Sequence, residues 1–159
     1  MSQTEGVKGE EVSGYLFEQF VNLSRVLTGY ERVELLGTGM AEIYYRAITG
    51  AYHEAVLRLL LEAKAIFEVY GERHPDFEQQ VRARIFQSVE FSPIAKNIIQ
   101  LWYLGSITTF DGPNPSATII SPDAYVNSLV WEAAGSHPAG AKYPGYGSWS
   151  LPPQPLGKR

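Results

Sequence analysis

The sequence predicts an all-α fold, a bundle of five or six helices with room for one short hairpin and a long extended C-terminal arm. Apolar residues recur at helical spacing through residues 13–104, and glycines follow several of these runs. Residues 135–159 instead hold five glycines and five prolines among recurring aromatics. We therefore expect a disordered leader at residues 1–12, a helical domain at residues 13–134 and a partner-wrapping arm at residues 135–159.

Four helices are predicted in the first half of the chain, over residues 13–27, 33–48, 52–70 and 76–89. Ser13 is a suitable cap for the first helix, and Gly29 is suited to end it in a left-handed conformation. The second helix has two equally good starts, at Val33 or near Thr38, because glycines destabilise the turn between them. Thr49-Gly50 is expected to end it, and Gly71 to end the third.

The chain changes character at the stretch Ile98–Gly105. This stretch is the apolar end of a fifth helix, which is expected to begin at Ser92-Pro93 and to stop at Gly105. Neighbouring helical residues point about 100° apart, so Trp102 and Tyr103 cannot both face one core. Trp102 therefore either packs in the core or belongs to an aromatic patch that faces a partner.

Behind this stretch, two β-branched runs flank a turn cluster. Thr108–Phe110 and Ala117–Ile120 lie on either side of residues 111–116, which are rich in Gly, Pro, Asn and Asp. The pattern indicates a short hairpin. Ser121 is then expected to cap a sixth helix from Pro122 to about Ala133.

Charge and composition exclude several classes of function. The net charge is −4, without the basic face that nucleic-acid binding requires, so no nucleic-acid partner is expected. The chain has no cysteine, and its three histidines have no ligand-spaced partners, so we expect no metal site. No catalytic motif is present, and no apolar run is long enough to span a membrane.

The charge is distributed unevenly along the chain. Residues 1–90 carry 14 acidic and 9 basic side chains, whereas residues 91–159 carry 3 and 4. The second part is also rich in aromatic residues, which is typical of a surface that another polypeptide covers.

Four segments together resemble a known family. They are Leu23–Gly29 (LSRVLTG), Leu101–Gly105 (LWYLG), Tyr125–Trp131 (YVNSLVW) and the closing Pro144-Gly145-Tyr146 with Trp149 and Pro152-Pro153. In this order and spacing they resemble the small, or gamma, subunits of bacterial membrane-bound FAD-dependent sugar and polyol dehydrogenases, such as the sorbitol, fructose and glucose dehydrogenases. The resemblance covers residues 15–155.

The resemblance implies a non-catalytic subunit that binds, stabilises and helps to mature a large partner. That partner is a flavoprotein of the glucose–methanol–choline type, which holds the FAD and oxidises CH–OH groups, while this chain binds no cofactor itself. A multihaem cytochrome c is often a further partner. The family's small subunit typically carries a twin-arginine export signal, which Met1–Glu11 does not show. We therefore expect the cytoplasm for the chain as written, and the periplasm or the membrane surface for a mature exported form.

The family tail often holds a cysteine where this chain has Ala141-Lys142-Tyr143, so association is expected to depend on non-covalent burial. We expect the partner to be bound by the aromatic residues of the second half and by one proline of the arm. These residues are Trp102, Tyr103, Tyr125, Trp131, Tyr143, Pro144, Tyr146 and Trp149. The alternative is an independent small helical enzyme or ligand-binding protein with an aromatic pocket near Trp102. A homo-oligomeric scaffold is a third and weaker interpretation.

Overall fold

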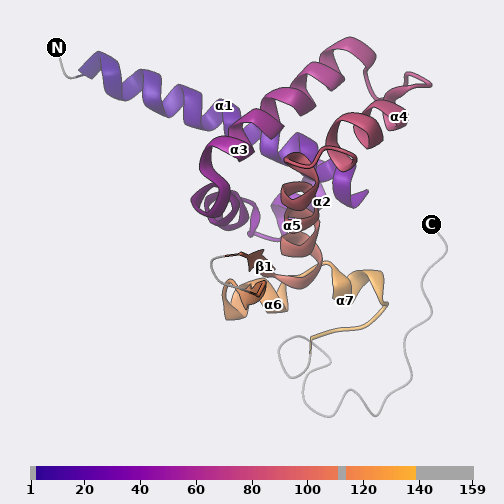
Figure 1. The fold of residues 1–159 in the computed structure, drawn as a ribbon. Coiled ribbons are helices and arrows are strands. Elements are labelled where there is room, and N and C mark those ends of the chain that lie inside the picture. The colour runs from indigo at the N-terminus through magenta and orange to yellow at the C-terminus, as the bar shows by residue number, and fades with distance from the viewer. Residues whose placement is uncertain (1–2, 111–113, 139–159) are drawn as a thin grey trace. The chain divides into compact units, whose positions relative to one another are not determined.

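The computed structural model describes the backbone of residues 3–110 and 114–138, with side chains from residue 13 onward (Figure 1). Within this part the chain is helical apart from one two-stranded sheet, which confirms the predicted all-α class. Contacts divide the chain into two compact units, Met1–Ile99 and Gln100–Arg159. The division falls inside the stretch where the sequence changes character.

Helix α1 (Gln3–Thr28) opens the first unit. The predicted start at Ser13 is wrong, because the helix already includes the backbone of residues 3–12. Glu10 and Glu11 are good helix formers and continue the helix there. The sequence of this segment lacks apolar periodicity, the signal on which the predicted start depended. The predicted end is confirmed, since Gly29 has φ 76° and its N–H donates to the Arg25 carbonyl oxygen at 2.9 Å.

The short helix α2 (Arg32–Gly37) and the long helix α3 (Ala41–Tyr70) follow. The later of the two predicted starts, near Thr38, agrees with the beginning of α3. The predicted stop at Thr49-Gly50 is wrong, because α3 continues through it with a kink at His53. The Thr49 hydroxyl donates to the Tyr45 carbonyl oxygen at 2.7 Å, a bond that commonly bends a helix without ending it.

The core of the first unit lies mainly between α1 and α3. Phe17 packs edge-on against Tyr45, with ring centroids 5.7 Å apart, and this pair extends the core towards the surface. The largest fully buried side chains of the first unit are Phe20, Leu23, Leu35, Tyr44, Ile48, Leu59, Leu60, Ile66, Ile85 and Ile98. Tyr15 was expected on the same apolar face of α1, but its side chain is 42% exposed.

Helix α4 (Phe77–Val81) passes directly into a π-helical turn, η1 (Arg82–Phe86), so the predicted regular helix over residues 76–89 is interrupted. Helix α5 (Phe91–Leu104) then begins slightly before the predicted Ser92-Pro93 start. The hydroxyl of Ser88 accepts the Phe91 N–H at 3.2 Å, so Ser88 takes the capping role that was expected of Ser92.

The second unit begins within the last turn of α5. It contains the antiparallel strands β1 (Ser106–Thr109) and β2 (Ser116–Ile119), which confirm the predicted hairpin. Ser121 caps helix α6 (Pro122–Val126) as predicted, because its hydroxyl accepts the Ala124 N–H at 3.1 Å. The sixth helix was expected to reach Ala133, but the chain breaks after α6 and resumes as α7 (Val130–Ala133).

Candidate partner-binding surface

The turn at Gly105 connects α5 to the hairpin and lies against α6. Gly105 has φ 64°, and its N–H donates to the Leu101 carbonyl oxygen at 2.9 Å. A Cβ atom at this position would lie 2.5 Å from the carbonyl oxygen of Ala124. Both the conformation and the close approach therefore require glycine. The last residue of the LWYLG segment thus packs directly against the backbone of α6.

A second backbone contact joins the same segment to the break between α6 and α7. The Leu129 N–H donates to the Trp102 carbonyl oxygen at 2.9 Å. In a continuous helix this N–H would bond to the Tyr125 carbonyl oxygen. That oxygen instead accepts the Ser128 hydroxyl at 2.9 Å and the Trp131 indole N–H at 2.8 Å. Side chains of the Tyr125–Trp131 segment therefore occupy the Tyr125 carbonyl oxygen, and the Leu129 N–H bonds to the end of α5 instead.

Polar side chains attach strand β1 to the end of α5. The amide of Gln100 donates to the Ser106 hydroxyl at 3.0 Å and accepts the Thr108 hydroxyl at 3.1 Å. A two-stranded hairpin alone is only marginally stable in water. The hydrogen bonds from Gln100 to β1 therefore stabilise the hairpin and fix its position relative to the end of α5.

Four of the eight predicted partner-binding residues lie in the described part of the second unit. The Trp102 side chain is fully buried, which is the core-packing alternative, whereas Tyr103 is half-buried. Tyr125 and Trp131 are also half-buried and pack edge to face, with centroids 5.2 Å apart. The other four, Tyr143, Pro144, Tyr146 and Trp149, lie outside the described residues.

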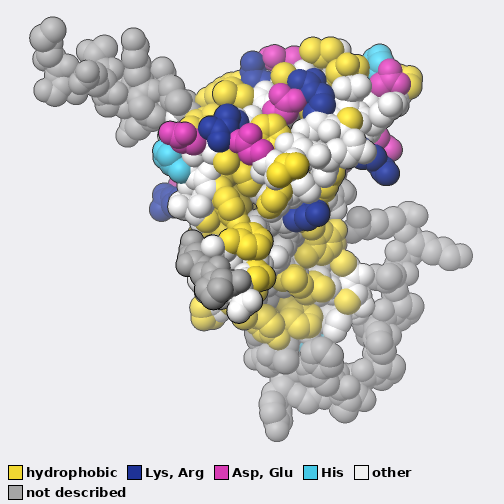
Figure 2. All heavy atoms as spheres, in the orientation of Figure 1, with side chains coloured by type: hydrophobic (Ala, Val, Ile, Leu, Met, Phe, Trp, Pro, Cys, Tyr) yellow, Lys and Arg dark blue, Asp and Glu magenta, His cyan; other side chains and the backbone are white. Residues whose placement is uncertain are grey.

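The described part of the second unit has few charges and exposes three large apolar side chains. From residue 100 to residue 138 the sequence has no Lys or Arg and three acidic residues. Leu104, Phe110 and Ile119 are each more than half exposed, at 51%, 62% and 58%. On the face shown in Figure 2, hydrophobic side chains gather over the hairpin and α6, and charged ones gather over the elements of the first unit. We call Leu104, Phe110 and Ile119 the apolar patch.

None of the three residues of the apolar patch was predicted as a site residue. Phe110 and Ile119 were recognised as strand formers, but their exposure depends on which face of a two-stranded sheet remains uncovered. The signal that could have identified them is the absence of charge around a predicted hairpin, since exposed strands usually carry charged residues.

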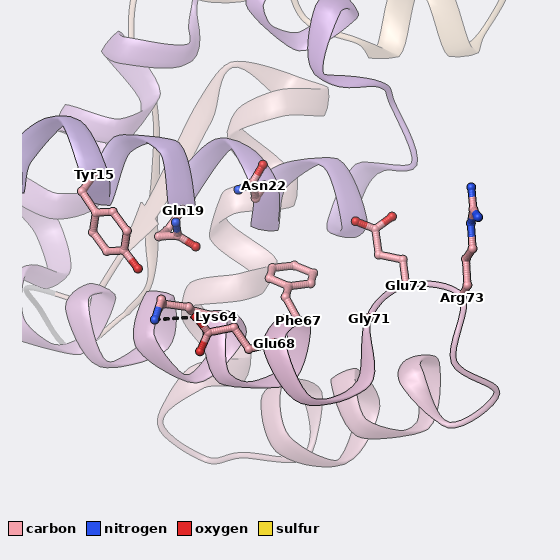
Figure 3. A pocket seen from close by; sticks show the side chains of 9 residues that line it. All are labelled: Tyr15, Gln19, Asn22, Lys64, Phe67, Glu68, Gly71, Glu72 and Arg73. Carbon is pink, nitrogen blue, oxygen red and sulfur yellow. Dashed lines mark ion pairs between the residues drawn. The ribbon is translucent and has the colours of Figure 1, made fainter.

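The first unit holds a cavity of about 690 Å³ between α1 and the end of α3 (Figure 3). The Tyr15 and Phe67 rings point into it from opposite helices. Lys64 forms an ion pair with Glu68 at 2.7 Å, and the hydrogen bonds that it donates to Glu68 and to the Tyr15 hydroxyl raise the pKa of Lys64. Its lining residues are Tyr15, Gln19, Asn22, Lys64, Phe67, Glu68, Gly71, Glu72 and Arg73.

The lining of this cavity combines two amides, two acids and two cations with two aromatic rings, so it suits a neutral, polar ligand. The sequence did not predict it, because polar residues on the outer face of a helix are ordinary. Among the described residues, no group of three or more His, Asp or Glu side chains is placed to hold a metal ion. No helix in this part of the chain combines the length and apolarity needed to cross a membrane.

Comparisons of the chain with protein-family models, curated proteins and solved structures found no match.

Proposed function

We propose that this chain is a non-catalytic small subunit that binds, stabilises and helps to mature the FAD-containing subunit of a sugar or polyol dehydrogenase complex. The observation that carries the proposal is the hydrogen bond between the Trp102 carbonyl oxygen and the Leu129 N–H. It joins two of the four segments that resemble the gamma subunits. Segments that resemble one family and also form one structural unit support a common role.

The character of the second unit supports partner binding as that role. An apolar patch with almost no charge around it is typical of a surface that is buried in a permanent complex. Permanent complexes bury upwards of about 2,000 Å² in total, which is more than the patch alone provides. The proposal therefore includes residues 135–159 as a second part of the interface.

The proposal assigns FAD and the oxidation of the CH–OH group to the partner, a flavoprotein of the glucose–methanol–choline type. A multihaem cytochrome c is a further candidate partner. The role of this chain is to cover apolar surface of the flavoprotein, so that the partner folds, retains FAD and stays soluble.

Co-expression tests the proposal. A candidate flavoprotein partner of the glucose–methanol–choline type is produced alone, with the full-length chain, and with a chain that ends at Gly135. We expect soluble, FAD-loaded flavoprotein only with the full-length chain, measured by flavin absorbance and dehydrogenase activity after purification. A flavoprotein that is equally soluble, loaded and active without this chain would overturn the proposal.

A second candidate function is the binding of a small ligand by the chain alone. The observation that favours it is the cavity between α1 and α3, since the fully buried Trp102 ring offers no surface to a ligand in the expected aromatic pocket. A chain that purifies as a monomer and shows saturable ligand-induced shifts of the Tyr15 and Phe67 resonances would favour this function.

A further inference from the structure

The pairing register of the hairpin shows which peptide groups of β2 face away from β1. Ile120 donates its N–H to the Gly105 carbonyl oxygen at 2.9 Å, which makes 105 and 120 a hydrogen-bonded pair. Bonded and non-bonded pairs alternate in an antiparallel ladder. Ile107 and Thr118 therefore form the next bonded pair, and the peptide groups of Ala117 and Ile119 point outward.

This outer edge of β2 is open in the described part of the chain. All four residues of β2 are exposed. Neither Ala117 nor Ile119 makes a backbone hydrogen bond to any described residue outside the ladder. Helix α6 approaches β2 without burying any of its side chains.

The edge also lacks most of the features that keep exposed strands from pairing. Natural edges are protected by charged residues, by proline within the strand, by bulges or by short length. The sequence Ser116-Ala117-Thr118-Ile119 has no charge and no proline, and its register contains no bulge. Only its short length restricts pairing, so the edge is suited to one short, specific strand.

We infer that the outer edge of β2 accepts an extended strand of the catalytic flavoprotein, which adds to the hairpin as a third strand. This inference rests on the proposed function and names the mode of binding. The incoming strand gains main-chain hydrogen bonds from Ala117 and Ile119. Ile119 on this edge is apolar and 58% exposed, and no Lys or Arg lies between residues 100 and 138 to pair with acidic side chains, so the strand carries apolar side chains and few acidic ones.

A second copy of this chain is the other strand that could occupy the edge. Pairing of two β2 strands would bury only a few residues per copy, far less than the ~800 Å² per partner of a stable interface. The edge therefore functions as one part of a larger heteromeric interface.

The variant Ala117→Pro tests the inference in the full-length chain. Proline removes the outward N–H and places its ring in the path of the incoming strand, but it leaves the bonded pairs with β1 intact. Ala117→Ser is the matched control, because it keeps the N–H and changes the side chain little. We expect roughly tenfold weaker binding of the flavoprotein by Ala117→Pro, and binding within about twofold of the unchanged chain by Ala117→Ser.

Hydrogen exchange on the unchanged chain provides a measurement that needs no variant. On complex formation we expect the amides of Ala117 and Ile119 to become protected, while the Thr118 amide, already bonded to β1, changes little. If the flavoprotein binds but Ala117→Pro binds equally well and these amides stay unprotected, strand addition is wrong and the proposed function stands. If the unchanged chain does not bind the flavoprotein at all, both fail. A homodimer that Ala117→Pro disrupts would overturn the inference in favour of a second copy.

Discussion

The Leu129 N–H donates a hydrogen bond to the Trp102 carbonyl oxygen at 2.9 Å. Trp102 lies in the last turn of α5, where carbonyl groups have no helical partner. Leu129 lies in the break between α6 and α7, where its N–H has none either. Two polar groups that would be costly to bury alone thus satisfy each other through one bond, which connects the end of α5 to the break between α6 and α7.

We expect Gly105→Ala to lower the free energy of unfolding by at least ~2 kcal/mol, because the new methyl group would meet the Ala124 carbonyl oxygen and the backbone has a positive φ. Urea unfolding followed by circular dichroism measures the change. Gly50→Ala is the control, since a Cβ atom on this helical glycine would have nothing within 4 Å and alanine there should stabilise the chain by about 0.5–1 kcal/mol. Equal effects of the two substitutions would contradict the packing of Gly105 on α6.

Two buried serines should respond differently to replacement by alanine. The Ser24 hydroxyl has no hydrogen-bond partner among the described residues, so we expect Ser24→Ala to leave stability unchanged or to raise it slightly. The Ser128 hydroxyl donates to the Tyr125 carbonyl oxygen, so Ser128→Ala should lower stability by about 1 kcal/mol. Chemical denaturation of both variants is the measurement, and a larger loss for Ser24→Ala would show that its hydroxyl has a partner.

Stability should fall at alkaline pH because of Tyr44. Burial raises the pKa of the Tyr44 phenol above its ordinary value near 10, so the phenol stays neutral in the folded state while it ionises in the unfolded state. The unfolded state then binds fewer protons, and the free energy of unfolding declines by about 1.4 kcal/mol per pH unit above pH ~10 from this group. Denaturation of the chain and of Tyr44→Phe between pH 8 and 11, values chosen around that ordinary pKa, should show a shallower decline in the variant. Equal slopes would contradict the burial of an un-ionised phenol.

The apolar patch should matter for partner binding and not for the stability of the chain. Phe110 is 62% exposed, so Phe110→Ser should leave the thermal midpoint of the isolated chain nearly unchanged. Burying that ring against a partner contributes about 1.5–3 kcal/mol, so the same variant should bind the flavoprotein at least tenfold more weakly. Val69→Ser, at a residue of the first unit that is 71% exposed, is the control and should bind normally. Equal binding by all three chains would exclude the patch from the interface.

Local signals in the sequence predicted the ends of elements well. Gly29, Gly71 and Gly105 were expected to end helices, and all three have positive φ angles immediately after a helix. The hairpin and the Ser121 cap were also predicted correctly, because turn and cap chemistry involves residues that are close in sequence.

The errors at Thr49-Gly50 and after α6 arose where residues distant in sequence decide the backbone. Thr49-Gly50 resembles a stop, but burial of Ile48 and Val56 on either side keeps α3 continuous through a kink. The break after α6 depends on the Trp102 carbonyl oxygen, which no local pattern around Leu129 reveals. The candidate site was predictable in part: its aromatic residues and low charge were recognised, and core packing of Trp102 was one of two alternatives, but the open edge of β2 was not predicted.

The most direct test of the central claim is the FAD content of the flavoprotein purified with and without this chain. We predict about one FAD per flavoprotein, with both polypeptides eluting together in size-exclusion chromatography, when the two are co-expressed. Without this chain, or with Phe110→Ser in its place, the FAD content and the soluble yield should fall. A flavoprotein that retains full FAD and elutes separately from this chain would contradict the account.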